Sequence, residues 1–265
     1  MNKCYATHYI MESPTENNRL ACKVNPHSFV NKYLINYISK KSTILDVGCG
    51  PGNISQALGM LPNMPTVVPI DISTKRITEV RKSQNISPVA ANAYEIPFKS
   101  NSFDFVFSRF LIEYMKNPNR MISEMYRVCK KDGRLFIQDL DGQFLNHYPV
   151  DTQLQKRVES FLDFLRIETG FDPNIGRKLY KYLFSNGFKN INVEVEAYHK
   201  FFGKISNDDY LYLSNKIDVL IPYMTKYFGS EQEANKLKKD YLDYLLIEET
   251  FTFSNLISVT GIKVT

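Results

Sequence analysis

A run of glycines directly after an apolar segment is the part of this sequence best suited to hold a ligand. Residues 44–52 read Ile-Leu-Asp-Val-Gly-Cys-Gly-Pro-Gly. Glycines let the backbone approach a ligand without a Cβ clash, and a helix that begins there points its N–H groups at the same spot. Asp46 would repel a pyrophosphate and would suit the ammonium of an amino acid. The GxGxG spacing differs from the GxGxxG of dinucleotide sites, and no Gly-Lys-Ser/Thr follows, which excludes a Walker A motif.

Polar residues follow the next apolar segments at positions where a nucleoside could be held. Asp71 ends a second apolar run about 20 residues after the turn, where a carboxylate can accept both ribose hydroxyls. The alternative for Asp71 is a helix cap. Asn92 and Ala93 follow a third run, and the Asn92 amide oxygen could accept a hydrogen bond from an adenine amino group. Ser108 and Arg109 end a fourth run, on the other side of the same crevice.

A second group of polar residues is expected on the side of the molecule that receives a reacting group. Asp139 and Asp141 follow a fifth apolar run, so two acids there could bind a cationic acceptor, or they could serve loop solvation and helix capping. His147 and Asp139 are the candidates for a catalytic role. The spacing of these groups does not suit a metal ion, and we expect none. The acceptor-side candidates are Arg109, Glu113, Tyr114, Asp139, Asp141, His147 and His199.

The elements that must position these residues alternate along the chain. Short apolar runs and amphipathic segments take turns between residues 43 and 140, which favours a parallel sheet with helices on both faces. Strands are expected at 43–47, 66–70, 88–91, 103–107 and 133–140, and helices at 53–60, 72–82 and 119–129. The later part predicts helices at 152–168, 175–185, 208–227 and 231–250, and strands at 191–198 and 256–264. Ser13 and Pro26 mark two helix starts before the sheet.

Composition narrows the class of protein further. The chain has 265 residues, 43% of them hydrophobic, and a net charge of +5. This is ordinary globular usage, and the mild positive charge is weak evidence for a nucleic-acid partner. No run is long and apolar enough for a membrane span or a signal peptide, so we expect a cytoplasmic protein that does not contact a membrane. The four cysteines show no CxxC pair and suggest free thiols.

Four motifs in order resemble class I S-adenosylmethionine-dependent methyltransferases, in particular the ubiquinone/menaquinone-biosynthesis-like branch. They are ILDVGCGPG at 44–52, PIDIS at 69–73, NAYEIPFKSNSFDFVFSRFLIEYM at 92–115 and RVCKKDGRLFIQDLD at 127–141. The resemblance implies an α/β, doubly wound, Rossmann-like sheet of seven strands whose last strand is antiparallel. It also implies that S-adenosylmethionine is the cofactor.

The resemblance assigns roles to individual residues. Gly48, Gly50 and Gly52 would border the methionine part of the cofactor, Asp71 would hold the ribose, and Asn92 with Ala93 would face the adenine. Ser108 and Arg109 would close the other side. Two positions depart from the family, which usually has Asp where Asn92 stands and often Met or Leu where Arg76 stands; Arg76 could stack on the adenine or be a solvated helix residue. The expected cofactor set is completed by Tyr9, Arg19, Asp46, Cys49, Ile72 and Arg76.

The extra sequence outside the motifs is expected to enclose the acceptor. We predict a helical lid over residues 1–40 and a methyltransferase domain over 41–265 with a helical insertion at 206–250. Tyr9 and Arg19 would lie near the transferred methyl. The insertion is rich in tyrosine, including Tyr241 and Tyr244, which could be ordinary core, an aromatic pocket for a cationic amine, or part of a dimer face. Acceptor contacts are expected from Glu113, Tyr114, Asp139 and Asp141.

The leading hypothesis is in-line transfer of a methyl group to a nitrogen or oxygen of a small molecule. Such a displacement depends mainly on alignment, so a missing catalytic triad does not argue against an enzyme. An RNA-modifying methyltransferase is the first alternative, although the chain lacks the Asn/Asp-Pro-Pro-Tyr/Phe and Pro-Cys motifs and a basic module. A catalytically silent, partner-binding subunit is the second. We expect a small-molecule partner, no nucleic acid, and a monomer or homodimer.

Overall fold

The structure, a computed structural model, describes residues 25–264. Seven strands form one sheet in the order β3-β2-β1-β4-β5-β7-β6. The strands are β1 (Thr43–Val47), β2 (Thr66–Asp71), β3 (Val89–Ala90), β4 (Phe103–Arg109), β5 (Cys129–Tyr148), β6 (Lys189–Phe202) and β7 (Phe251–Ile262). The strands from β1 to β5 pair in parallel, and β7 lies antiparallel between β5 and β6. This confirms the predicted doubly wound, Rossmann-like sheet and its antiparallel last strand.

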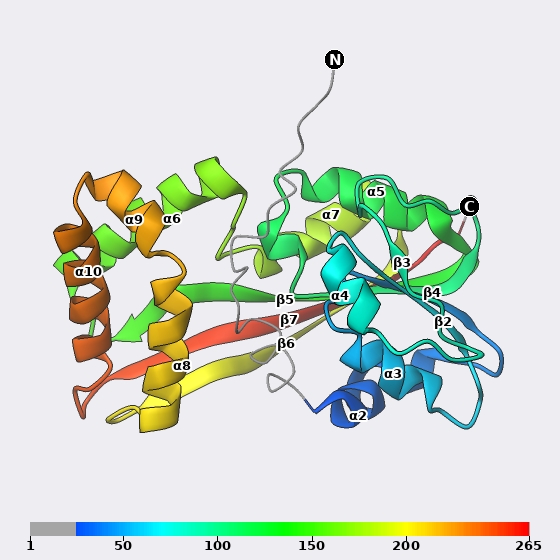
Figure 1. The fold of residues 1–265 in the computed structure, drawn as a ribbon, viewed down its shortest axis with the longest axis horizontal. Coiled ribbons are helices and arrows are strands. Elements are labelled where there is room, and N and C mark those ends of the chain that lie inside the picture. The colour runs from blue at the N-terminus through cyan, green and yellow to red at the C-terminus, as the bar shows by residue number, and fades with distance from the viewer. Residues whose placement is uncertain (1–24, 265) are drawn as a thin grey trace, which may run out of the picture.

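Helices cover both faces of the parallel half of the sheet (Figure 1). Ser73 accepts a hydrogen bond from Arg76 N–H and begins α4, as the sequence predicts, while Asn117 and Pro118 begin α5. The helices of this half are α2 (Pro26–Phe29), α3 (Asn53–Gly59), α4 (Thr74–Glu79), α5 (Pro118–Val128) and α7 (Leu179–Ser185), with the short turns η1 (Val30–Leu34), η2 (Ile35–Tyr37), η3 (Ile112–Tyr114) and η4 (Gly176–Lys178). The predicted helix start at Ser13 lies outside the described residues.

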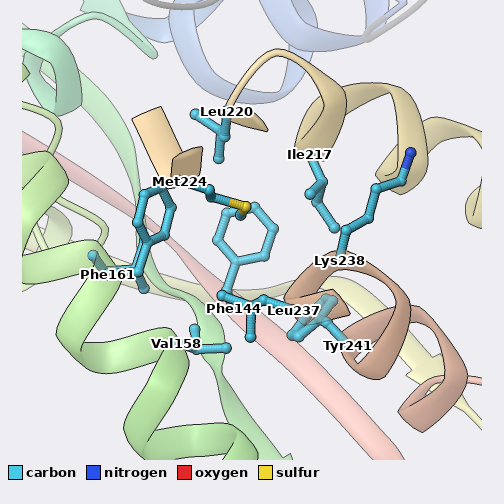
Figure 2. Close-up of a pocket in the computed structure, with 10 residues that line it drawn as sticks. Phe144, Val158, Phe161, Ile217, Leu220, Met224, Leu237, Lys238 and Tyr241 are labelled. Atoms are coloured by element: carbon cyan, nitrogen blue, oxygen red, sulfur yellow. The ribbon is translucent and has the colours of Figure 1, made fainter. Parts of the chain in front are cut away.

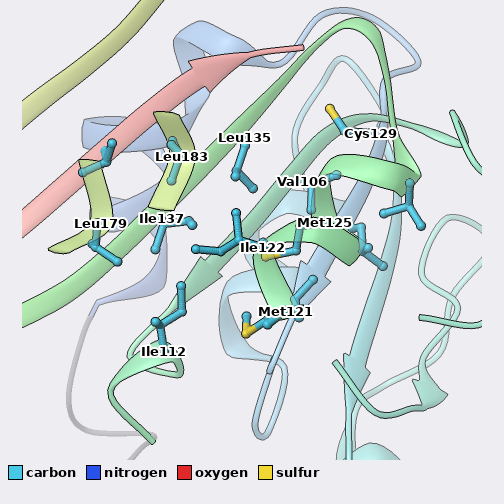
Figure 3. Packing of buried hydrophobic residues seen from close by; sticks show 14 of the residues in the cluster. Val106, Ile112, Met121, Ile122, Met125, Cys129, Leu135, Ile137, Leu179 and Leu183 are labelled. Carbon is cyan, nitrogen blue, oxygen red and sulfur yellow. The ribbon is translucent and has the colours of Figure 1, made fainter. Parts of the chain in front are cut away.

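Two apolar layers hold these helices on the sheet. On one face, Met121, Ile122 and Met125 of α5 pack into the same buried cluster as Val106 and Leu135 of the sheet (Figure 3). Phe29 and Leu34 belong to the layer on the other face, which also contains Phe105, Phe107 and Phe136. The i, i+4 spacing of Met121 and Met125 explains why α5 buries one stripe. The parallel strands are apolar on both faces because both are covered.

The antiparallel strands extend past the rest of the sheet and carry a second group of helices. β5 is 20 residues long, and its far half pairs only with β7 after a bulge between Asp141 and Asn146. At this end lie α6 (Thr152–Thr169), α8 (Asn207–Asp218), α9 (Ile221–Phe228) and α10 (Glu231–Tyr244), which share a separate buried cluster (Figure 1). We call these four helices the helical cap. The single helix predicted at 208–227 is wrong, because α8 ends at Asp218 and α9 begins next to Pro222.

Candidate active site

The register of the parallel strands gathers the predicted site residues at one edge of the sheet. Val47 at the end of β1 pairs with Ile70 of β2 on one side and with Ser108 of β4 on the other. Ser108 in turn pairs with Ile137 of β5. Because the carboxyl ends of these strands are level, the residues that follow them meet, and ligands bind at this edge in open α/β sheets.

The glycine turn leaves β1 in a conformation that side chains rarely adopt. Gly48, Gly50 and Gly52 have φ angles of 76°, 55° and 78°. The N–H groups of Gly48 and Cys49 both donate to the Ile70 carbonyl, at 2.8 and 3.0 Å, which ties the turn to β2. A Cβ at Gly48 would lie 2.5 Å from a methyl carbon of Leu111. The positive φ therefore favours glycine at this position, and any added Cβ would also displace the Leu111 side chain.

Asp71 connects the turn to the next strand. Its Oδ2 accepts a hydrogen bond from Gly50 N–H at 2.9 Å, and its Oδ1 accepts one from Ser73 N–H at 2.9 Å. Arg76 Nη1 lies 3.9 Å from the same Oδ1. Each carboxylate oxygen has a second lone pair, so Asp71 can still accept two hydroxyl groups. Arg76 is buried, which rules out the solvated position that the sequence left open.

Asp46 lies beneath the turn with little contact with water. It is 4% exposed, and its Oδ2 accepts a hydrogen bond from Ser55 Oγ of α3 at 2.6 Å. Burial raises the pKa of Asp46 to about 7, and the charge of Asp71 adds to this rise while the Ser55 hydrogen bond opposes it. Burial also raises the pKa of the Cys49 thiol far above its usual value. A buried carboxyl with such a pKa responds strongly to a nearby cation.

The residues predicted to face the base and to close the other side follow β3 and end β4. Ala91 N–H donates to the Asp71 carbonyl at 2.9 Å, so Asn92 and Ala93 begin directly beside Asp71. The Asn92 Oδ1 accepts a hydrogen bond from Tyr94 N–H at 2.9 Å. On the opposite side, Ser108 is fully buried and its Oγ donates to the Val47 carbonyl at 2.9 Å.

Arg109 extends from the end of β4 into an aromatic environment. Its Nε donates to Gln138 Oε1 at 2.9 Å, and its guanidinium carbon lies 3.9 Å from the ring centre of Phe110 and 5.0 Å from that of Phe29. Burial lowers the pKa of Arg109, and a hydrogen bond with Tyr198 of β6 counters this effect. Arg109 therefore presents a positive charge among rings at the ligand edge.

A buried polar chain leads from this edge to the helical cap. The Asp139 Oδ2 accepts a hydrogen bond from Glu113 N–H at 3.1 Å. Glu113 Oε2 accepts one from Gln143 Nε2, and Gln143 Oε1 accepts one from Lys216 Nζ of α8 at 2.8 Å. Glu113, Asp139, Gln143 and Lys216 are each no more than 5% exposed. Sequence reasoning missed Gln143 and Lys216; the only local signal was Gly142, whose φ of 73° allows the β5 bulge.

Asp141 and His147 have positions that favour structural roles. The Asp141 carboxylate accepts hydrogen bonds from Arg177 N–H, Nε and Nη2 at 2.7–3.0 Å, which fixes η4 against β5. The two ring nitrogens of His147 bond to Thr252 Oγ1 and to the Phe144 carbonyl, and burial lowers its pKa. His147 lies beyond the β5 bulge, in the part of the sheet that supports the cap.

The tyrosines of the cap are mostly core. Tyr241 and Tyr244 are buried and pack on His147, which argues against a dimer face built from them. Beside Phe144, whose φ is 64°, the cap forms a partly open apolar cavity of about 30 Å³ (Figure 2). Its lining comes from β5, α6, α8, α9 and α10 and includes Phe161, Leu220, Met224 and Leu237. A space of this size holds little more than one water-sized group.

The remaining candidates contribute differently. Tyr114 packs against Phe171, with ring centres 5.5 Å apart, and Ile72 is 44% exposed beside Asp71. Tyr9 and Arg19 lie outside the described residues. Within residues 25–264, no group of three or more His, Cys, Asp or Glu side chains could hold a metal ion. No helix of this same range is long and apolar enough to cross a membrane.

The fold and this edge together define a class I S-adenosylmethionine-dependent methyltransferase domain. Residues 45–137, about a third of the chain, match the family described as "Methyltransferase domain". A methyltransferase of Schizosaccharomyces pombe is 26% identical over 163 residues, which cover 56% of each chain. The ubiquinone/menaquinone biosynthesis C-methyltransferase of Rickettsia typhi is 30% identical over 115 residues, or 39% of this chain and 46% of the relative. The chain thus spans about half the length of these curated relatives.

A solved structure with a similar fold is phosphoethanolamine N-methyltransferase 2 of Haemonchus contortus, in complex with phosphomonomethylethanolamine and S-adenosylhomocysteine. Its TM-score is 0.53 at 17% identity, covering 96% of this chain and 53% of that one. At this identity the likeness concerns the fold alone.

Proposed function

We propose that this protein transfers the methyl group of S-adenosylmethionine to a nitrogen or oxygen atom of a small molecule. One observation carries the proposal: Gly50 N–H donates to the Asp71 carboxylate at 2.9 Å. This contact joins the glycine turn, which suits the methionine part of the cofactor, to a carboxylate that suits the ribose. It lies at the edge of the sheet where β1 and β2 end. The residues therefore fit the cofactor of the family to which the domain belongs.

The chain's own residues would hold the cofactor and leave its methyl group accessible. Asp46 and the turn would take the methionine end, Asp71 the ribose, and Asn92 with Ala93 the adenine. The bound cofactor supplies a sulfonium methyl whose leaving group needs no activation. The work left to the protein is alignment and exclusion of water, which accounts for a large part of the rate in such displacements.

The buried acids favour a heteroatom as the acceptor. Glu113, which follows β4, and Asp139, within β5, lie together, and a hydroxyl or ammonium acceptor has a proton that must leave. A carboxylate in this place can orient that group and take the proton. We include Tyr114 and Arg109 in the acceptor pocket, and exclude Asp141 because Arg177 occupies it. The name of the Rickettsia relative specifies a carbon acceptor. The proposal of a nitrogen or oxygen acceptor is therefore supported by Glu113 and Asp139 alone.

The helical cap favours a small acceptor over a polymer. Lys216 of α8 reaches the site through Gln143, so the cap lies close to the acids. We propose that the cap, with the predicted lid at 1–40 including Tyr9 and Arg19, encloses the acceptor. An RNA enzyme would instead need an open basic groove.

Calorimetry with S-adenosylhomocysteine tests the cofactor assignment, and transfer from methyl-labelled S-adenosylmethionine tests the reaction. The labelled cofactor is incubated with the protein and, separately, with a small-metabolite extract, total RNA and total protein. Label in the small-metabolite fraction supports the proposal, while label in RNA replaces it with the RNA alternative. Tight binding without transfer to any fraction would favour a silent subunit, and no binding would refute the cofactor site.

A further inference from the structure

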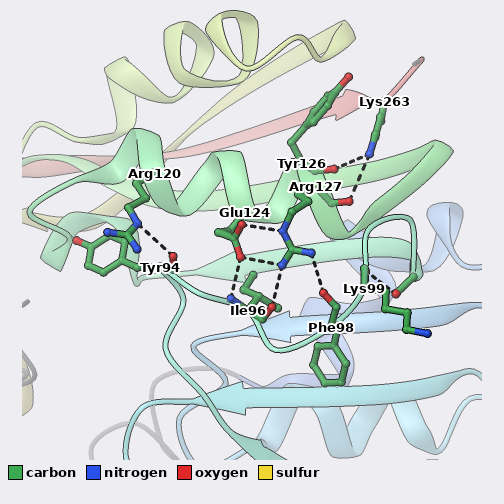
Figure 4. Close-up of polar contacts among 10 residues, drawn as sticks. Tyr94, Ile96, Phe98, Lys99, Arg120, Glu124, Tyr126, Arg127 and Lys263 are labelled. Carbon is green, nitrogen blue, oxygen red and sulfur yellow. Dashed lines mark hydrogen bonds and ion pairs between the residues drawn. The ribbon is translucent and has the colours of Figure 1, made fainter.

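One face of α5 binds the backbone of a loop through side chains that are only partly buried. Arg120, Glu124 and Arg127 are spaced i, i+4 and i+7, so they share this face. All three form hydrogen bonds to backbone atoms of residues 94–98, which lie between β3 and β4 (Figure 4). The loop has no strand neighbour, so α5 supplies the partners that a strand would otherwise provide.

Arg127 and Glu124 form the centre of this contact. Arg127 Nη1 donates to the Phe98 carbonyl at 2.7 Å and Nη2 to the Ile96 carbonyl at 2.8 Å. Nε and Nη2 also donate to the two oxygens of Glu124 at 2.7 and 2.8 Å. Glu124 Oε2 then accepts from Ile96 N–H at 2.9 Å. Only the planar fork of arginine can make all these bonds at once.

The contact continues to the residue proposed to face the adenine. Arg120 Nε donates to the Tyr94 carbonyl at 3.2 Å, and the Tyr94 hydroxyl accepts from Asn117 N–H at 3.0 Å. Tyr94 N–H donates to Asn92 Oδ1 at 2.9 Å. Every link from Arg127 to Asn92 is thus a hydrogen bond or a short piece of backbone.

We propose that Arg127 and Glu124, assisted by Arg120, are positioning residues that set the protein's preference for adenine in its nucleoside ligand. They hold the loop so that Asn92 and Ala93 present a fixed acceptor and fixed backbone groups to the base. A site whose polar groups are rigidly placed binds poorly to an analogue of its ligand in which a hydrogen-bond donor is replaced by an acceptor. This inference rests on the proposed function, because it takes the ligand to be S-adenosylmethionine.

The natural control is Lys263, a buried cation that follows β7 and contacts the end of the same helix. Lys263 Nζ donates to the carbonyls of Tyr126 and Cys129, to Asn101 Oδ1 and, at 3.4 Å, to the backbone carbonyl of Arg127. It therefore caps the far end of α5 without a bond to the Arg127 side chain or to residues 92–98 (Figure 4). Loss of Lys263 should destabilise the helix alone. The two kinds of variant therefore separate positioning of the loop from stability of the fold.

The experiment measures the affinity of S-adenosylhomocysteine relative to S-inosylhomocysteine, in which a carbonyl replaces the adenine amino group. The wild type should prefer the adenine ligand at least about tenfold. Arg127→Lys and Glu124→Gln should each reduce that ratio at least about threefold, and the Ile96 amide should exchange faster. Lys263→Met should lower Tm and leave the ratio unchanged. Glu124→Gln preserves size, so it remains informative if Arg127→Lys does not fold.

The outcomes separate the two hypotheses. If the wild type binds neither nucleoside, the proposed function fails. If the wild type binds both equally, or if the ratio survives Arg127→Lys and Glu124→Gln, the positioning role is overturned while the cofactor site stands. A ratio reduced equally by Lys263→Met would assign the effect to stability and also overturn it.

Discussion

Asp46 should make cofactor binding depend on pH in the range around neutrality. Its carboxyl is buried beneath the glycine turn, and burial raises its pKa from 3.8 to about 7. The groups that act on it are Ser55, which donates a hydrogen bond, and Asp71, whose charge repels its ionised form. Cys49 does not ionise in this range, because burial raises its pKa. A change between pH 8 and pH 6 therefore alters the charge of Asp46.

The size of the effect follows from the fraction of Asp46 that is ionised. If the ligand's ammonium binds only beside the carboxylate, the apparent Kd is the intrinsic Kd divided by that fraction. For a pKa of about 7 the fraction is about 0.9 at pH 8 and about 0.1 at pH 6. Affinity should therefore fall about tenfold as the pH drops from 8 to 6, which is about 1.4 kcal/mol.

Calorimetry with S-adenosylhomocysteine at pH 6, 7 and 8 measures this directly. Binding near pH 7 should also release a proton, seen as a heat that varies with the ionisation enthalpy of the buffer. Asp46→Asn is the control, because its affinity should be lower and independent of pH. A wild-type affinity that is flat across this range, or an Asp46→Asn protein that keeps the slope, would show that Asp46 does not face the ammonium.

The same carboxyl affects stability with a definite sign. The folded protein holds the Asp46 proton to a higher pH than the unfolded chain does, so this group's stabilising contribution is complete below 3.8 and is lost as the pH rises to about 7. Asp46→Asn removes the charge that burial penalises. The ligand-free variant should therefore gain Tm relative to wild type at pH 8 more than at pH 5.

Three further predictions test other parts of the site. Asp71→Ala should weaken S-adenosylhomocysteine binding at least about tenfold, since hydrogen bonds to a charged group contribute about 1.5–3 kcal/mol each; calorimetry showing a smaller loss would reject the ribose assignment. Gly48→Ala should lower the free energy of unfolding, measured in urea, by about 1–3 kcal/mol, because residue 48 has a positive φ. The control is Gly229→Ala: Gly229 has a similar φ of 71°, but nothing lies within 4 Å of the added Cβ, so the loss should be smaller. Only Gly48→Ala should impair binding. Lys216→Met should lower Tm through loss of a buried hydrogen bond but leave the affinity for S-adenosylhomocysteine within about twofold, and weaker binding would contradict the assignment of Lys216 to the acceptor side.

The placement of the proposed cofactor residues at one edge of the sheet could be predicted because the information for it is local. The glycine turn, Asp71, Asn92 and Ser108 each lie at or just after the carboxyl end of a short apolar strand, and parallel strands place such residues together without further knowledge. The sequence also predicted that Ser73 caps the N-terminus of α4. The environment of Arg76 was not, since its burial depends on packing between α4 and the turn.

The acceptor side could not be predicted in the same way because its contacts are distant in sequence. Asp141 meets Arg177 36 residues later, and Gln143 meets Lys216 73 residues later. The β5 bulge that turns Gln143 inward adds residues to one strand, and apolar patterning does not reveal such an insertion. Pro222 could have shown the break between α8 and α9, because proline favours the first turn of a helix.

The β5 bulge connects the parallel part of the sheet to the helical cap. Before it, β5 pairs in parallel with β4 as far as Gln138, and the carboxylate of the next residue, Asp139, accepts a hydrogen bond from Glu113 N–H. After it, the same strand supports the helical cap, and Gln143 within the bulge bonds to both Glu113 and Lys216. A shift of α8 therefore reaches Glu113 through one side-chain amide. We infer that the cap and the bulge set the choice of acceptor, whereas the glycine turn and the loop held by Arg127 set the choice of cofactor.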